Sequence, residues 1–392
     1  MNTTYPQAIS VSFAYPVHFS RGLFSSANPL LAGVVAPAGG RRPVRVAACI
    51  DAGVDACHRD LVPRISAYCQ THLPRLELAA APLKVPAGED AKNGWPPALQ
   101  LIRSIGALDL DRQSCIIAIG GGSVLDLVGF AAAVIHRGLR LIRVPTTTLA
   151  QCDAGIGVKN GINLFGQKNF IGTFAPPFAV LNDGDFLSTL CFQDWIGGVA
   201  EAFKVAIIKD GDFFQFLQRH ADGLRRRQSA TMEQVLHRCA VLHLDHIRSG
   251  GDPFEFGAAR PLDFGHWAAH RLEILSAHEL GHGQAVAVGI ALDSCLAMSR
   301  GLIKPDEFER ILTGLASVGL PIWHPALELR NADGVLDIIK GLEDFRQHLG
   351  GRLTITLPDG IGRKVEVHRV DAGDVEAAVD CLRERRDSVA SP

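Results

Sequence analysis

The chain lacks several features that would place it in a specialised class of protein. None of its 392 residues lies in a run of roughly 18 unbroken apolar residues, the length that a membrane span needs, so we expect no membrane partner. Its 39 Lys and Arg are offset by 41 Asp and Glu, and the net charge of -2 leaves no basic field for nucleic acid. The one dense basic run, residues 225–227, is typical of a solvated helix face.

Cysteine pairs of the C-x-x-C type are also absent. The nine cysteines are scattered, and an odd, unpatterned set in a chain of this size predicts reduced thiols in the cytosol. The N-terminus has no basic segment leading into an apolar run, so we expect no signal peptide and a cytoplasmic protein. With 47% hydrophobic and 20% charged residues, the composition is that of a globular protein long enough for two domains.

The pattern of apolar residues divides the chain into two parts. Strand patterns alternate with helix patterns in the first part, which predicts parallel βαβ units and a doubly wound sheet. The predicted strands cover residues 9–13, 44–50, 115–119 and 141–144, and the predicted helices 97–105 and 125–134. After about residue 185 the spacing becomes mostly helical. We therefore expect an α/β Rossmann-like nucleotide-binding domain, residues 1–185, and a mostly α-helical domain, residues 186–392.

A glycine-rich segment, GGGSVLDLVGF, follows the predicted strand at 115–119 and opens the next helix. Glycines at such a turn let backbone N–H groups approach a phosphate, and the helix dipole favours the negative charge. Asp126 lies on the first turn of that helix, and Asp51, at the end of its strand, is placed like a ribose-binding carboxylate. Because the spacing is not G-x-G-x-x-G, a tight turn without a ligand and a capping role for Asp51 stay open.

Candidate metal ligands gather in the second part. Glu201 shares a helix face with Lys204, three residues later. Four histidines follow within seventeen residues, in two pairs spaced four apart: His266 with His270, and His278 with His282. A carboxylate with two imidazoles suits a divalent ion such as Zn²⁺. Either pair satisfies the spacing, and the absence of H-E-x-x-H argues against a zincin protease.

A second polar run lies on a glycine-rich segment of the first part. It contains Asp153, Lys159, Asn163, Lys168 and Asn169. Lysine and asparagine side chains on such a segment suit a phosphate or a polyol, and an exposed polar loop is the alternative.

Taken in order, these blocks resemble the dehydroquinate synthase family, the sugar phosphate cyclases. The densest is GGGSVLDLVGFAAAVIHRGLRLIRVPTTTLAQCDAGIGVKNGIN, followed by GQKNFIGTF, GGVAEAFKVAII, LDFGHWAAH and HGQAVAVGI. The match runs from about residue 51 to residue 292. The resemblance implies the family's two-domain fold, a homodimer, a phosphorylated sugar as substrate, and NAD with Zn²⁺ or Co²⁺ as cofactors.

The resemblance also implies a role for each matching position. The metal ligands are Glu201, His266 and His282. The catalytic residues are Lys204, His270, Asp153 and Lys159. The substrate contacts are Asn169, Lys168, Asp263, Arg260 and Arg137, the last reaching the phosphate site of the neighbouring subunit. The cofactor contacts are Asp51, Glu89, Lys92, Gly121, Gly122, Ser123, Asp126, Thr146, Thr147, Phe186 and Thr189.

The implied reaction uses NAD transiently. A ring hydroxyl is oxidised to a ketone, which acidifies the neighbouring C–H, and phosphate then leaves by elimination. The hydride returns, and the ring opens and closes again as a carbocycle by aldol addition. The metal and Lys204 stabilise the developing oxyanion, while His270, ordered water or the substrate phosphate moves protons.

Several positions depart from the family pattern, and at least two of the lost cations belong to the region that binds an acid substrate's carboxylate. The family arginine seven residues before the first metal histidine is Ala259, with Arg260 one step later. The family lysine twenty-one residues before that histidine is Asp245, flanked by His243 and His246. The family asparagine three before it is Asp263, and the C-terminal lysine pair is missing, with Arg346 or His348 as candidate replacements.

Because an anion in a dry pocket needs charged partners, these losses favour a neutral C7 sugar phosphate such as sedoheptulose 7-phosphate. Asp263 resembles the valiolone-type and gadusol-type cyclases, but His270 resembles the dehydroquinate type. The combination RPLDFGHWAAH most resembles the synthase-like proteins of ebo gene clusters. Three alternatives stay open: dehydroquinate synthase proper, with Arg260 in the missing place; a metal-dependent polyol or alcohol dehydrogenase of the same fold; and a non-catalytic sensor of NAD or a sugar phosphate.

Overall fold

The computed structural model describes residues 3–36, 42–250, 254, 261–277, 279–348 and 352–389. A seven-stranded parallel sheet forms the centre of the first part, in the order β1-β9-β6-β5-β2-β3, with β4 also paired to β2. Its strands are β1 Val17–Ser20, β2 Val44–Asp51, β3 Leu76–Leu78, β4 Leu83–Val85, β5 Cys115–Gly120, β6 Arg140–Pro145 and β9 Ala179–Asp183.

Helices cover both faces of this sheet. Successive side chains of each strand point to opposite faces, and since the strands are apolar on both, each face must be buried. In β2, Val46 and Ile50 contact one core cluster, while Ala47 and Cys49 contact another. The first cluster includes α1 Leu30–Val35 and α3 Leu61–Thr71, and the second includes α4 Trp95–Gly106 and α5 Gly122–Val134. The short helix α2, Ala52–Cys57, follows β2. The predicted doubly wound α/β fold is confirmed.

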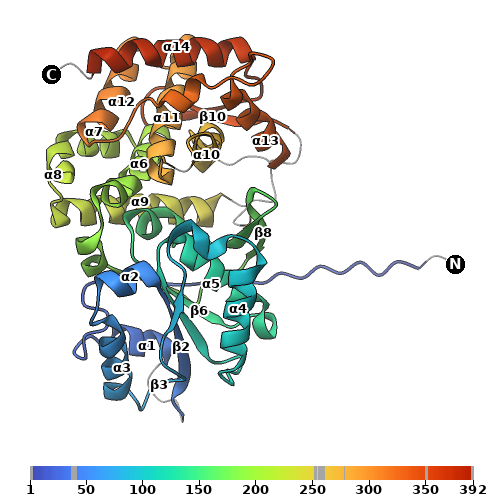
Figure 1. Ribbon diagram of the computed structural model, residues 1–392, viewed down its shortest axis with the longest axis vertical. Helices are drawn as coiled ribbons and strands as arrows, with labels where there is room; N and C mark the ends of the chain where they lie inside the picture. The colour runs from blue at the N-terminus through green and yellow to red at the C-terminus, as the bar shows by residue number, and fades with distance from the viewer. Residues whose placement is uncertain are drawn as a thin grey trace.

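The second part is mostly helical, as predicted, and lies above the sheet domain in Figure 1, with α9 along the boundary. Its helices are α6 Phe192–Lys209, α7 Gly211–Arg219, α8 Ala221–Arg225, α9 Ser229–Ser249, α10 His266–Leu275, α11 His282–Ser299, α12 Pro305–Ser317, α13 Lys340–His348 and α14 Ala372–Val389. A two-stranded sheet, β10 Ile355–Pro358 and β11 Lys364–Val367, packs with them. Within the described residues, no helix is both long and apolar enough to cross a bilayer.

The strand predicted at residues 9–13 is wrong. That segment belongs to an extended N-terminal arm that leaves the rest of the chain near Phe13, whose ring lies against that of Phe254, and the first strand begins at Val17 (Figure 1). Its alternating side chains are exposed, with Ile9 85% and Val11 67% accessible. Among the described residues no neighbouring strand pairs with it, and alternation produces a strand only where such a neighbour exists.

The polar segment after residue 153 is more ordered than a loop. Residues 159–174 form an antiparallel hairpin, β7 Lys159–Leu164 and β8 Gln167–Phe174. Gly161 and Gly172 face each other across it, so closely that a Cβ on Gly172 would lie 2.5 Å from the carbonyl oxygen of Asn160. The glycines therefore allow close strand pairing rather than flexibility.

Candidate active site

Three predicted metal ligands meet where three helices converge. Glu201 lies in the middle of α6, and His266 and His282 are the first residues of α10 and α11. One ligand atom from each residue lies within 4.8 Å of the other two. Oε1 of Glu201 is 3.7 Å from Nε2 of His266 and 3.8 Å from Nε2 of His282. These atoms are close enough to share one divalent ion.

Two contacts between glycine backbones let these helices approach one another. Gly283, next to His282, lies against Gly197 of α6, and a Cβ on Gly283 would overlap the Gly197 carbonyl oxygen. Gly289 of α11 lies against Gly265, the residue before His266, with a similar overlap. Since a Cβ has no room at Gly283, Gly289 or Gly265, glycine is required at these three positions for the packing that assembles the site.

We expect Gly283→Ala to weaken both folding and metal binding, because its methyl group would push α11 away from α6. Overpacking of this kind typically costs about 1–3 kcal/mol. Melting temperature and metal content check the prediction. Gly373→Ala is the matched control, since nothing lies within 4 Å of a Cβ there. A Gly283→Ala protein with unchanged melting temperature and metal content would show that the contact is dispensable.

The carboxylate of Glu201 fits a cation. Its Oε1 is buried and accepts no hydrogen bond within the described part of the chain, which is costly unless a positive charge lies nearby. Burial raises the pKa of the Glu201 carboxyl to about 7, although Lys204 beside it acts in the opposite direction. A divalent ion on Oε1 would remove this penalty.

Both histidines also fit. Nδ1 of His266 lies 3.1 Å from the carbonyl oxygen of Phe264, and Nδ1 of His282 lies 2.9 Å from Oε1 of Glu273. Because these partners are acceptors, each Nδ1 carries a proton, and Nε2 is the ring atom that faces Glu201. Although burial opposes it, Glu273 and Glu201 raise the pKa of His282, so a metal ion at its Nε2 would displace a proton. Burial lowers the pKa of His266 well below its usual value, so this ring is neutral and able to bind a metal.

A chain of buried charges leads from Glu201 to α9. Lys204 forms an ion pair with Glu201 and lies 3.4 Å from Oδ2 of Asp153, in the π-helical turn Ala150–Ala154. Oδ1 of Asp153 lies 2.8 Å from Nδ1 of His243. Burial opposes the charge on Lys204, but Asp153 and Glu201 together raise its pKa, so the ammonium stays charged.

His243 was not among the predicted site residues. It extends the buried stripe of α9 that contains Met232, Leu236 and Cys239, and this spacing is the signal that indicates an inward-facing side chain. By contrast, Asp245, which replaces the family lysine, is 54% exposed and pairs with Arg248.

His270 and Asp263 lie beside the metal ligands. The His270 ring is 5.5 Å from that of His266 and 6.0 Å from that of His282, measured between centroids, and the side chain is exposed. Asp263 lies in the turn before α10, and its charge contributes to the raised pKa of Lys204. Arg260 and His278, two further candidates, lie outside the described residues.

A cavity of about 190 Å³ lies between the glycine-rich turn and His282, one of the three predicted metal ligands. Residues from both parts of the chain line it, including Asp51, Gly121, Gly122, Ser123, Thr147, Gly281 and His282. The start of α5 therefore faces the same space as a predicted metal ligand. Asp51 also caps α2, with Oδ1 2.7 Å from the Gly53 nitrogen, so this residue both caps a helix and lines the cavity.

The predicted cofactor residues of the turn Gly88–Lys92 bind the glycine-rich helix. Oε2 of Glu89 accepts a hydrogen bond of 2.6 Å from Ser123, and Nζ of Lys92 lies 2.8 Å from Oδ2 of Asp126. Nζ of Lys92 also donates to Oδ1 of Asn169, at 2.9 Å. These contacts connect the glycine-rich helix to the β7–β8 hairpin.

The other predicted cofactor residues lie at the ends of β6 and β9. Thr146 follows β6 and is buried, and within the described residues its Oγ1 has no hydrogen-bond partner. Phe186 and Thr189 share the turn Gly184–Thr189 and both contact His58, at 5.2 Å between ring centroids and 2.9 Å from Oγ1 to Nε2. His58 was not predicted, because a lone histidine after a short helix carries no recognisable pattern.

The predicted phosphate contacts divide into two groups. Lys168 and Asn169 of β8 face the site, with Nζ of Lys168 2.8 Å from Oε2 of Glu273. Lys159 and Arg137 are exposed. Arg137 has a φ of +64° and directly follows His136 at +52°, so the chain turns sharply there and presents the arginine outward.

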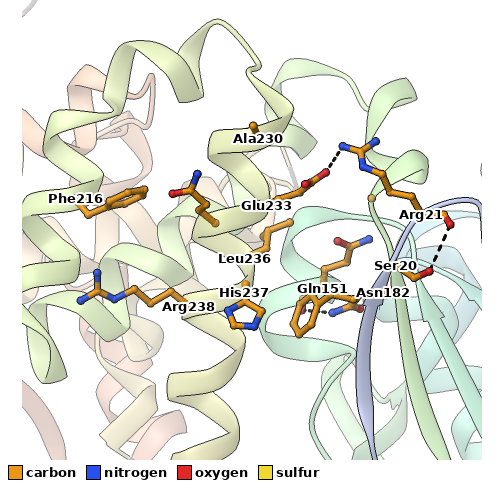
Figure 2. Close-up of a pocket in the computed structure, with 13 residues that line it drawn as sticks. Ser20, Arg21, Gln151, Asn182, Phe216, Ala230, Glu233, Leu236, His237 and Arg238 are labelled. Atoms are coloured by element: carbon orange, nitrogen blue, oxygen red, sulfur yellow. Dashed lines mark hydrogen bonds and ion pairs between the residues drawn. The ribbon is translucent and has the colours of Figure 1, made fainter.

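A larger cavity, of about 850 Å³, lies between β1, β9 and α9 (Figure 2). None of the predicted site residues lines it, and the turn Ala150–Ala154 contributes Gln151 rather than Asp153. Its arginines are paired: Arg21 with Glu233, and Arg238 with Asp210. Since these cations are occupied by carboxylates, we do not place the phosphorylated substrate there.

Two family models cover most of this framework. The model described as 3-dehydroquinate synthase N-terminal matches residues 82–196, and that described as 3-dehydroquinate synthase C-terminal matches residues 198–340. A 2-epi-5-epi-valiolone synthase from Streptomyces glaucescens is 35% identical over 381 residues, which cover 95% of this chain and 93% of that protein. The chain belongs to the dehydroquinate synthase family.

Other members of the dehydroquinate synthase family are similarly close. A 3-dehydroquinate synthase from Desulforamulus reducens is 35% identical over 297 residues, which cover 76% of this chain and 80% of that protein. The solved structure of ValA, a 2-epi-5-epi-valiolone synthase from Streptomyces hygroscopicus subsp. jinggangensis 5008 with NAD⁺ and Zn²⁺ bound, is 32% identical. Its TM-score is 0.86, over 97% of this chain and 100% of that chain. These relatives are named as valiolone or dehydroquinate synthases, not as ebo-cluster proteins.

Proposed function

We propose that this protein is an NAD- and metal-dependent sugar phosphate cyclase that acts on a neutral C7 sugar phosphate, sedoheptulose 7-phosphate or a close analogue. The observation that carries the proposal is the cavity lined by both the glycine-rich turn and His282 of the metal set, since it would bring a nicotinamide and a metal ion to the same substrate. Family membership, and the NAD⁺ and Zn²⁺ bound in the similar ValA, support it.

Each cofactor would supply one kind of chemistry. A Zn²⁺ ion held by Glu201, His266 and His282 would polarise adjacent hydroxyl groups of the sugar. An NAD molecule held by the glycine-rich turn, with its ribose near Asp51, would accept a hydride and later return it.

The chain's own residues would do the remaining work. The buried ammonium of Lys204 would stabilise the alkoxide oxygen, with Asp153 fixing its position. His270, exposed beside the metal ligands, would relay a proton from the acidified carbon through ordered water. Lys159, Lys168 and Asn169, together with Arg137 of the partner subunit, would hold the phosphate.

The region expected to bind a carboxylate supports a neutral substrate. Asp245 is exposed and paired with Arg248, so it adds no cation to the site. Arg346, a candidate replacement for the missing lysines, forms an ion pair with Glu343 on an exposed face of α13. Asp263 adds negative charge beside Lys204. The names of the similar valiolone synthases agree, because valiolone is a polyhydroxylated cyclohexanone without a carboxylate.

The test compares substrates. The metal-loaded protein with NAD is incubated with sedoheptulose 7-phosphate and, separately, with the acid sugar phosphate that dehydroquinate synthase uses, and phosphate release is measured. We expect release from the neutral sugar. Turnover of the acid sugar alone would instead identify a dehydroquinate synthase proper.

We also propose that the active form is a homodimer. Arg137 points outward, as a residue that completes a partner's site would. The N-terminal arm exposes Ile9, Val11 and Phe13, and residues 3–14 make no backbone hydrogen bond within the described chain. An extended arm with an apolar face is suited to add a strand to a second copy.

Removal of residues 2–14 is therefore expected to weaken the dimer by about tenfold or more. Sedimentation at several protein concentrations measures this. The triple variant Ile9→Ser, Val11→Ser, Phe13→Ser keeps the length and should weaken the dimer as well. Unchanged association in both variants would exclude the arm from the interface, and a monomeric parent protein would refute the dimer.

We also place the protein in the cytoplasm, because its nine cysteines are free thiols, as is usual in a reducing compartment. The chain would divide into an NAD-binding domain, residues 1–185, and a metal- and substrate-binding domain, residues 186–392.

A further inference from the structure

Glu273 is a buried carboxylate between the two halves of the site. It lies on α10, seven residues after His266, and therefore projects from the same helix face two turns later. Its side chain is only 3% exposed. Oε1 lies 2.9 Å from Nδ1 of His282, and Oε2 lies 2.8 Å from Nζ of Lys168. One carboxylate thus contacts both a proposed metal ligand and the β7–β8 hairpin.

We propose that Glu273 is a positioning residue that fixes the imidazole of His282 for the metal ion and ties this ligand, through Lys168, to the β7–β8 hairpin. The inference rests on the proposed metal site. An acceptor at Nδ1 holds the proton there, so that the lone pair of Nε2 faces Glu201. His266 obtains the same orientation from the backbone carbonyl of Phe264, and only His282 depends on a side chain for it.

Fold stability does not explain a carboxylate at this position. A charge removed from water is costly, and an apolar residue in a buried site is often at least as stabilising as an ion pair. The two groups that reach its oxygens, Nδ1 of His282 and Nζ of Lys168, are both donors, so each carboxylate oxygen has a hydrogen-bond partner. Its two contacts instead restrict two side chains that lie far apart in the sequence.

On the hairpin, Lys168, which contacts Glu273, and the residue next to it also contact the predicted cofactor residues. Asn169, next to Lys168, accepts a hydrogen bond from Lys92, which also pairs with Asp126 of the glycine-rich helix. Nζ of Lys168 lies 3.8 Å from Oε1 of Glu89 as well. A sugar phosphate that binds Lys168 and Asn169 is therefore held against the cofactor residues and the metal ligand at once, and Glu273 is the link to the metal.

The test measures metal affinity by competition with a chelator, together with the visible absorption spectrum of the Co²⁺-loaded protein. Glu273→Gln should weaken affinity by about ten- to a hundredfold and change the Co²⁺ spectrum, since loss of an orienting carboxylate has effects of this size. Glu279→Gln is the matched control, because Glu279 is exposed and lies three residues before His282. It should change affinity by less than about twofold. Equal affinity in the Glu273→Gln and Glu279→Gln proteins would overturn the proposal.

Two more variants separate the parts of the inference. If Glu201→Gln leaves metal affinity unchanged, the proposed metal site itself is wrong; if Glu201→Gln abolishes binding while Glu273→Gln does not weaken it, only the positioning role fails. Lys168→Met should weaken metal binding in the parent protein but not in the Glu273→Gln background, because the two act through one contact. Additive effects of the two changes would overturn the link to the hairpin.

Discussion

Glu201→Gln is expected to lose the metal ion and, with it, essentially all cyclase activity. Glutamine keeps the shape of the side chain but removes the charge from a fully buried site, where Oε1 faces two imidazole nitrogens. A neutral amide oxygen cannot offset the cost of burying a divalent cation. Bound metal should fall well below one ion per chain, and phosphate release should fall by at least about a thousandfold.

Thermal unfolding distinguishes loss of the ion from loss of the fold. Added Zn²⁺ should raise the melting temperature of the parent protein, because it binds the folded state, and should leave that of Glu201→Gln unchanged. Glu233→Gln, a carboxylate of the larger cavity in Figure 2, should behave like the parent protein. A Glu201→Gln protein that still binds metal tightly would refute the ligand assignment.

Lys204→Met is expected to retain the metal ion and lose activity. The ammonium is buried, with 2% of its side chain exposed, and Asp153 and Glu201 raise its pKa, so it is positively charged throughout the neutral range. Removing a preorganised charge at a developing oxyanion typically costs about a hundred- to a thousandfold in kcat. Phosphate release under saturating substrate measures this, alongside metal content.

Lys209→Met provides the control, because Lys209 lies on the same helix, half-buried, and is not among the proposed site residues. Its kcat should stay within about twofold of the parent value. A Lys204→Met protein that binds metal and keeps kcat within about tenfold of the parent would remove Lys204 from the reaction.

The parts of the fold that could be predicted from the sequence are those with a strong local pattern. Val44–Asp51 and Cys115–Gly120 are buried on both faces, as parallel strands inside a doubly wound sheet must be. The alternation at residues 9–13 wrongly predicted a strand of the sheet. The same pattern also suits an exposed, extended arm that could pair with another chain.

The candidate site shows a different limit. From the spacing alone, His266 with His270 and His278 with His282 were equally good pairs of metal ligands. The family resemblance instead indicated one residue from each pair, His266 and His282. The structure brings His266 and His282 together through backbone contacts of Gly265 and Gly283, which no helical period reveals. Glu273 and His243 were not predicted because a buried polar side chain is recognised by its partners, and two of these partners, Lys168 and Asp153, lie far away in the chain.

The central claim is that NAD is recycled within one turnover, and the ratio of phosphate released to NADH formed tests it most directly. The metal-loaded protein is given sedoheptulose 7-phosphate with less NAD than sugar, and both products are followed in the same reaction. We predict many phosphates released per NAD and no net NADH. NADH accumulating in step with substrate consumption, without phosphate release, would contradict the account and identify a polyol dehydrogenase.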